Sequence, residues 1–236
     1  MRRLRLRLLL LVVLVTPLLV AAEPAQAADE CEGLMVCVPV AGPWVVVPTS
    51  SGANRPQARW QLTCPRGYVV GGLDAELSHR AIDVSFLGHL GSPVNPGIST
   101  SRSAVFVASF VGSAARAPTF RPHIGCIPAA GSGIRVPTAV TAFPPGQPTT
   151  LRVHTVRVRP GTATVTQACT AREQLVGASH AIGFFRSTPP SASLVATVTS
   201  TRTVSDNRVV VRARGDAELG GVRAVVQVHA ACARAR

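Results

Sequence analysis

Two short segments of the chain place a histidine three residues before a cysteine: "RPHIGC" at residues 121–126 and "VQVHAAC" at residues 226–232. Imidazole nitrogen and thiolate sulfur are common zinc ligands, so the recurring spacing could indicate a metal site used twice. In an extended strand, however, side chains three residues apart point to opposite faces. A cysteine held in a disulfide also offers no thiolate. We therefore predict no metal or cofactor at either segment.

The alternation of apolar and polar residues indicates what these segments do instead. In "VRAVVQVHAAC" the even positions up to Cys232 are all small or apolar, whereas Gln227 and His229 fall on odd positions. "TFRPHIGC" repeats the pattern, since Cys126 shares its parity with apolar residues and not with Arg121 or His123. This period is typical of a half-buried strand, so we expect each cysteine in a core and each histidine outside. The ligand-binding residues that we predict are the outward ones: Arg121, His123, Gln227 and His229.

A pair of carboxylates offers a second kind of chemistry. Asp74 and Glu76 lie two residues apart and are followed by His79 and Asp83. A glycosidase needs two carboxylates at a defined separation, which this pair could supply. Paired acids on a strand are more often its solvated face, and the corresponding segment "GASHAIGF" of the second half has neither acid. We interpret His79 and the later His89 as isolated surface side chains.

A serine and a histidine stand side by side in "GASHAIG" at residues 177–183. Ser179 and His180 could form a triad with Asp206 or Asp216, because triads are assembled in space and not along the sequence. The order is not the Gly-x-Ser-x-Gly of a nucleophile elbow, and no strand-to-helix pattern surrounds it. A secreted hydrolase is therefore our alternative function, and we assign no catalytic residue.

The six cysteines suggest both a compartment and a fold. An even number in an exported chain argues for three disulfides. Cys64 and Cys126 are separated by 62 positions and Cys169 and Cys232 by 63, and each second cysteine closes a His-x-x-Cys segment. We predict these two pairs, one in each copy of an internal repeat. The remaining Cys31 and Cys37 are predicted to pair in a small loop, although either could instead reach a core cysteine.

The segments that must position these residues are mostly short strands rich in Val, Thr and Phe, including 104–112, 193–204 and 208–215, and "SDN" joins the last two as a hairpin. No convincing helix is present, and residues 171–176 would make one turn at most. The fold class predicted is all-β, with two tandem disulfide-closed antiparallel modules that are sandwich-like or barrel-like and related by the repeat. The predicted divisions are a signal peptide at 1–27, a cysteine loop at 28–43, a first module at 44–128, a Pro/Gly-rich linker at 129–150 and a second module at 151–236.

Composition and charge limit the functional classes. A basic start, an apolar run and small residues before position 28 predict a secretory signal, and no later stretch is long and apolar enough to span a membrane. The formal net charge is +13, every basic residue is Arg, and the pattern is typical of a high-GC bacterium. Such charge favours an anionic envelope component as a partner.

Arginines gather on single strand faces. Arg208, Arg212 and Arg214 share one face of the strand at 208–215, and Arg157 and Arg159 form a second short stripe. We interpret both as solvated faces. Nucleic-acid binding is not expected, because aromatic residues are few and no recognised motif is present. The function predicted is a secreted or extracytoplasmic, non-enzymatic protein that binds or structures a component of the envelope or its surroundings.

Overall fold

The computed structural model describes residues 29–49, 55–87, 98–100, 102–113, 117–129 and 149–234. The predicted signal peptide, nearly all of the predicted linker and His89 lie outside these ranges. The described chain is all-β, with curled antiparallel sheets, three disulfides and little helix.

The elements of the first part of the chain are the strands β1 (Val38–Ala41), β2 (Trp44–Val46), β3 (Gln57–Thr63), β4 (Tyr68–Leu77), β5 (Ile82–Leu87), β6 (Ile98–Thr100), β7 (Ser103–Phe110) and β8 (Thr119–Pro128). The elements of the second part are β9 (Thr149–Val158), β10 (Gly161–Ala168), β11 (Glu173–Phe185), α2 (Ala192–Ala196), β12 (Val198–Ser205), β13 (Arg208–Gly215), the 3₁₀ helix η2 (Ala217–Leu219) and β14 (Arg223–Arg234).

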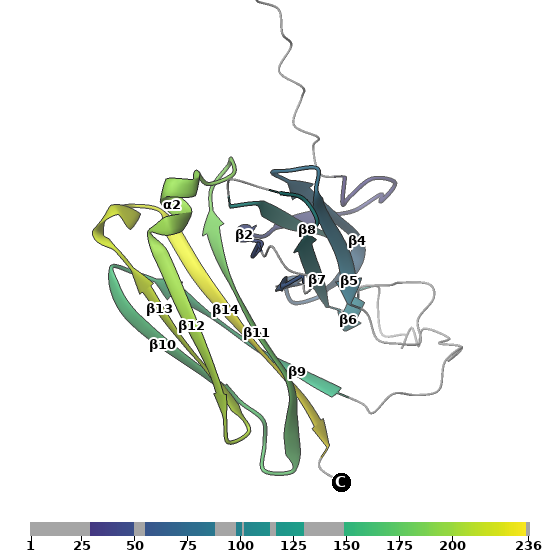
Figure 1. The fold of residues 1–236 in the computed structure, drawn as a ribbon. Coiled ribbons are helices and arrows are strands. Elements are labelled where there is room, and N and C mark those ends of the chain that lie inside the picture. Colours follow the sequence, from purple (N-terminus) through teal and green to yellow (C-terminus); the bar gives the residue numbers. More distant parts are fainter. Residues whose placement is uncertain are drawn as a thin grey trace, which may run out of the picture.

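One seven-stranded sheet runs through both halves of the described chain. Its strand order is β1-β8-β2-β11-β14-β9, with β4 paired to β8. The link between the halves is the short strand β2, which pairs with β8 through Val45 and Val46 and with β11 through Trp44 and Val45. Strands that begin more than a hundred residues apart are therefore neighbours in one sheet (Figure 1).

Two smaller sheets cover this central sheet. In the first half β3, β7 and β5 pair in that order, with β6 beside β7, and enclose a core that includes Trp60, Phe106 and Ile124. In the second half β10, β13 and β12 pair in that order and enclose a second core that includes Val211 and Leu219. Figure 1 shows the three-stranded sheet on the side of the molecule away from the first half. One of its faces is thus available to solvent.

Strand β14 is buried on both of its faces. Its even residues, such as Val226 and Val228, belong to the second core, whereas Val225 belongs to the first core together with Ala181 of β11. The reason is that β14 lies inside the seven-stranded sheet, with β10, β12 and β13 packed on one side and β3 approaching the other. An alternating sequence therefore does not imply here that one face is exposed.

All three predicted disulfides are confirmed: Cys31–Cys37, Cys64–Cys126 and Cys169–Cys232. Cys64, Cys126 and Cys232 are buried to 1% exposure or less, as the alternation predicted. A bridge that closes a loop of about 60 residues restricts the unfolded chain by roughly 4 kcal/mol in the loop-entropy model. The two long bridges thus supply much of the stability that a chain with so few aromatic residues needs.

One local expectation is wrong. The start of the segment 193–204, predicted as strand, is the short helix α2, because the Ser191 side chain caps it by accepting a hydrogen bond from the Leu194 N–H at 3.2 Å.

No helix in the described part of the chain is long and apolar enough to cross a membrane.

Pro122 lies within β8, which is an interior strand, although proline is usually confined to edge strands and bulges because it lacks an N–H. The Pro122 carbonyl accepts from Gly42 N–H at 2.8 Å, so the backbone polar groups of Pro122 face the corner between β1 and β2. Its missing N–H therefore costs no ladder hydrogen bond.

Candidate functional site

His123, the histidine of "RPHIGC", is covered by the N-terminal cysteine loop. Its Nε2 lies 2.8 Å from Oε1 of Glu76, and its Nδ1 lies 3.5 Å from Oε1 of Glu30. The exposed fraction of His123 is only 6% and that of Glu30 is 7%. Arg121 completes the group with a contact of 3.4 Å to the Glu76 carboxylate. The two carboxylates approach opposite ring nitrogens, so they cannot share one metal ion with this imidazole.

Two glycines allow the cysteine loop to lie this close. Gly72 of β4 and Gly125 of β8 face each other in the register, and a Cβ added to either would lie 2.0 Å from the carbonyl oxygen of Glu30. Only a residue without a side chain fits at these two positions. The Gly of "RPHIGC" therefore serves the docking of the loop, and His123 lies beneath that loop.

His229, the histidine of "VQVHAAC", lies at the contact between the two halves of the chain. Gln227 Oε1 accepts the Gln61 N–H of β3 at 2.7 Å, and Gln227 Nε2 donates to the Gln61 carbonyl at 3.1 Å and to Thr155 Oγ1 at 3.0 Å. The side-chain amide of Gln227 thus bonds to the backbone of the edge strand β3 in the way that the backbone of a neighbouring strand would. This bidentate contact holds β3 of the first half against β14 of the second.

The same network fixes the proton of His229. Because the amide nitrogen of Gln227 donates elsewhere, its Oε1 must accept from His229 Nε2 at 2.6 Å, which leaves His229 Nδ1 unprotonated and buried without a partner. Burial lowers the pKa of this imidazole to about 4, and the charge of Arg59 acts in the same direction. His229 is therefore a neutral structural side chain at ordinary pH.

The prediction that both histidines point outward is wrong, and Gln227, at 4% exposure, is likewise buried. The alternation correctly separated each cysteine from each histidine, since the two occupy different faces of their strands. The second face is covered in each case by a distant segment, the loop around Glu30 over β8 and strand β3 over β14. Of the four predicted ligand-binding residues, Arg121 alone is not buried, and it is half-buried against Glu76.

The residues considered for hydrolysis do not assemble into one site. Asp74 accepts from the Asp29 N–H at 2.7 Å, Glu76 contacts His123, and His79 packs its ring against Phe110. Asp83 lies in another sheet, opposite Ser109 of β7. The Asp74 side chain thus binds the N-terminal segment, and the Glu76 side chain binds residues of β8.

The contacts of His180 do not support the hypothesis that Ser179 and His180 belong to a catalytic triad. His180 Nε2 lies 2.8 Å from Ser200 Oγ of β12, not from Ser179, and His180 Nδ1 is buried without a hydrogen-bond partner. In a Ser-His-Asp triad, a carboxylate accepts from that nitrogen and stabilises the imidazolium. Burial lowers the pKa of His180 instead, and the Arg202 charge acts in the same direction.

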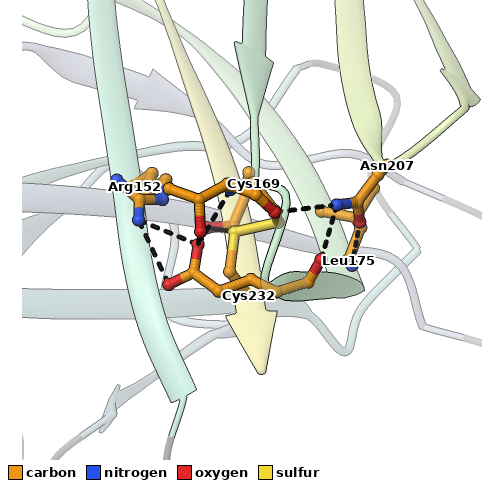
Figure 2. A network of polar contacts seen from close by, with 8 residues as sticks. Arg152, Cys169, Leu175, Asn207 and Cys232 are labelled. Atoms are coloured by element: carbon orange, nitrogen blue, oxygen red, sulfur yellow. Dashed lines mark hydrogen bonds and ion pairs between the residues drawn. A yellow bond between two sulfur atoms is a disulfide. The ribbon is translucent and has the colours of Figure 1, made fainter. Parts of the chain in front are cut away.

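Asn207 fastens the tip of the β12–β13 hairpin to β11, as Figure 2 shows. Its Oδ1 accepts the Leu175 N–H, and its Nδ2 donates to the Glu173 carbonyl at 2.6 Å. The Glu173 carboxylate accepts from Arg152 at 2.8 Å and from the N–H and hydroxyl of Thr170, and the Thr170 bonds, followed by Arg152, hold the pKa of Glu173 below its ordinary value. An open hollow of about 410 Å³ adjoins this network beside Val204 and Asp206. The side chains of Glu173 and Asn207 in its lining are already engaged in this network, so we assign it no ligand.

The strongest candidate surface is the outer face of the three-stranded sheet, which we call the Thr/Arg face. Its inner counterpart is the second core, where Val209, Val211 and Ala213 are fully buried. The register places three outward residues side by side in each of four rows across β10, β13 and β12: Thr162–Arg214–Thr199, Thr164–Arg212–Thr201, Thr166–Val210–Thr203 and Ala168–Arg208–Ser205. All of these side chains are exposed except Val210, which is half-buried.

The middle of the Thr/Arg face is positively charged and uncompensated. None of the described carboxylates pairs with Arg212 or Arg214, whereas Arg208 lies 3.6 Å from Asp206 in the hairpin turn. In the register, each of these two arginines is flanked by a threonine on either neighbouring strand. The face therefore presents two identical sets of hydrogen-bond donors in a regular array.

The alternation along 208–215 predicted that Arg208, Arg212 and Arg214 share one face but did not indicate the array across three strands. The predicted hairpin at "SDN" is enough to predict the pairing of β12 with β13, which is half of the array. A two-residue turn at Asp206 and Asn207 sets Thr201 opposite Arg212 and Thr199 opposite Arg214. The position of β10 on the other side of β13 had no local signal.

No family model, curated protein or solved structure matches the chain.

Proposed function

We propose that the protein is an exported, non-enzymatic binding protein that holds an anionic component of the cell envelope or its surroundings on the Thr/Arg face. The observation that carries this proposal is the pair of exposed rows in which Arg212 and Arg214 stand between threonines and have no acidic partner within the described parts of the chain. Guanidinium groups and hydroxyls are donors that suit phosphate, sulfate or carboxylate oxygens. The rows repeat identical donors and set no base against a nucleophile, which suits binding and not catalysis.

Export is supported by the sequence and by the disulfides. The predicted signal at residues 1–27 would deliver the chain to an oxidising compartment, where three disulfides persist. A net positive charge then favours attraction to an anionic envelope.

We further propose that the two halves are sandwich-like modules that arose by an internal duplication. The residue six places after the first cysteine, Val70 or Leu175, lies opposite the second cysteine of its half, and a bulge follows in both. The smaller sheets have corresponding strand orders, β3-β7-β5 and β10-β13-β12. Strands β2 and β9 also correspond, since each precedes the first strand of its half's smaller sheet and pairs with the last strand of its half. In this account only the second module developed an exposed cationic sheet.

The test of the proposed function is a charge reversal on the face. Binding of the mature protein to inorganic polyphosphate is measured by calorimetry at several salt concentrations, for the wild type and for the double variant Arg212→Glu/Arg214→Glu. We expect the variant to lose at least tenfold in affinity and to show a shallower salt dependence. The matched control is Arg66→Glu/Arg157→Glu, which changes the net charge equally. Arg66 is exposed in a turn of the first half, and Arg157 lies opposite Val225, on the side of the central sheet away from the face. Equal losses in both double variants would contradict the proposal.

A further inference from the structure

The Thr/Arg face has a repeat distance that restricts what can lie on it, provided that it is the binding surface proposed above. Rows two residues apart on a strand are separated by about 6.6–6.8 Å, and neighbouring strands by about 4.8 Å. Arg212 and Arg214 occupy adjacent rows of this kind. A ligand that uses both guanidiniums in the same way must therefore present anionic groups about 7 Å apart along the direction of β13.

A phosphodiester backbone meets this distance. Three backbone bonds of an extended chain cover roughly 3.3–3.6 Å, so six bonds between phosphorus atoms cover about 7 Å. Each phosphate could accept from one guanidinium and from threonine hydroxyls on both sides, such as Thr164 and Thr201 around Arg212. A chain of directly linked phosphates has only two bonds per repeat, and it would crowd several charges onto one row.

The composition of the face decides between two classes of phosphodiester. Single-stranded nucleic acid also has six bonds per repeat, but proteins that bind it stack its bases on aromatic side chains. None of the residues in the four rows is aromatic; the face offers hydroxyls, which suit the hydroxyl groups of a polyol. We propose that the ligand is a linear polyol phosphate lying along β13, with consecutive phosphates on the rows of Arg214 and Arg212.

The next rows limit the length that is recognised. The row after Arg212 has the half-buried Val210 at its centre, and Arg208 in the last row already faces Asp206. Beyond the other end, Asp216 follows β13 and receives the Glu218 N–H at 2.9 Å. Two phosphates are therefore the recognised unit, and further phosphates add little.

The test uses synthetic glycerol phosphate oligomers with one, two, three or four phosphates, and binding is measured by calorimetry at constant ionic strength. We expect the second phosphate to raise affinity at least tenfold. The third and fourth phosphates should each add less than threefold, after correction for the larger number of positions in which a longer oligomer can bind. Arg214→Gln should remove the step at the second phosphate and leave binding of the single phosphate at Arg212. The control Arg66→Gln should keep the step, because Arg66 is exposed in a turn of the first half.

Two further probes separate the alternatives. Inorganic triphosphate that gains as much as the glycerol series would show that only total charge matters, and oligothymidylate that binds more tightly at equal phosphate number would favour nucleic acid; either result would overturn the inference. Polyphosphate binding that depends on Arg212 and Arg214, without a step in the glycerol series, would refute the inference alone. Failure of every polyanion to bind would refute the proposed function as well.

Discussion

His229 shows how a buried imidazole couples the stability of this fold to pH. The folded-state pKa of His229 is lowered to about 4, whereas an imidazole in the unfolded chain titrates near 6.5. The unfolded chain therefore binds a proton that the folded chain refuses as pH falls from 6.5 towards 4. The contribution of neutral His229 to the free energy of unfolding is fully present above pH 6.5 and is lost as the pH falls through this window. His180 contributes in the same direction.

We predict that His229→Gln flattens this dependence. A glutamine amide can still donate to Gln227 Oε1 but does not titrate. The difference in unfolding free energy between pH 7 and pH 4.5, measured by urea denaturation, should fall by about 2 kcal/mol relative to the wild type. His154→Gln, a change at an exposed position of β9, is the control and should leave the slope as it is. An unchanged slope in His229→Gln would mean that the buried network does not hold the neutral form.

At Gly125 the limiting interaction is steric. We predict that Gly125→Ala displaces the N-terminal loop, because its Cβ would lie 2.0 Å from the Glu30 carbonyl oxygen. The Cys31–Cys37 disulfide should then be reduced and alkylated faster under mild reductant, and the unfolding free energy should drop by roughly 1–3 kcal/mol. Gly221→Ala, where an added Cβ meets nothing within 4 Å, should change neither quantity. Equal alkylation rates in both variants would contradict the docking of the loop.

Among the elements, the β12–β13 hairpin depends on a turn residue with two roles. Asn207 has φ of 64°, in the left-handed region, and its side chain joins the hairpin tip to β11. Asn207→Gly preserves the backbone conformation but removes the side-chain bonds, so we predict a loss of about 2–3 kcal/mol in unfolding free energy measured by thermal or urea denaturation. Asp206→Gly, at φ of 46° with an exposed side chain, should cost less than 0.5 kcal/mol or be slightly stabilising. Similar changes at the two positions would show that the side-chain bonds of Asn207 do not stabilise the hairpin.

The same elements show what the sequence could and could not predict. Cysteine spacing predicted the three disulfides, and alternation correctly placed Cys126 and Cys232 in buried cores. Alternation could not reveal that the polar faces of β8 and β14 are also covered, because the covering segments are about 90 to 170 residues away in the chain. The Thr/Arg face escaped prediction for a similar reason, since the pairing of β10 with β13 is set by the fold and not by a turn.

On the scale of the whole molecule, the two halves should unfold as one unit. They share the central sheet through β2, and Gln227 joins β14 to Gln61 of β3. We predict one calorimetric transition in which the calorimetric and van't Hoff enthalpies agree. Gln227→Leu should remove the bidentate contact, leave buried polar groups of Gln61 and His229 without partners, and split or broaden that transition. Two resolved transitions in the wild type would contradict the shared-sheet account.

The most direct measurement of the central claim is a map of where a polyanion binds. Amide chemical shifts of the isotope-labelled protein are followed by NMR during titration with a glycerol phosphate oligomer. We predict that the largest changes in amide chemical shift fall on the outward residues of the central rows: Thr162, Thr164, Thr199, Thr201, Arg212 and Arg214. The largest changes at the N-terminal loop, at Arg66 or at the hollow beside Asp206, or no saturable change at all, would contradict it.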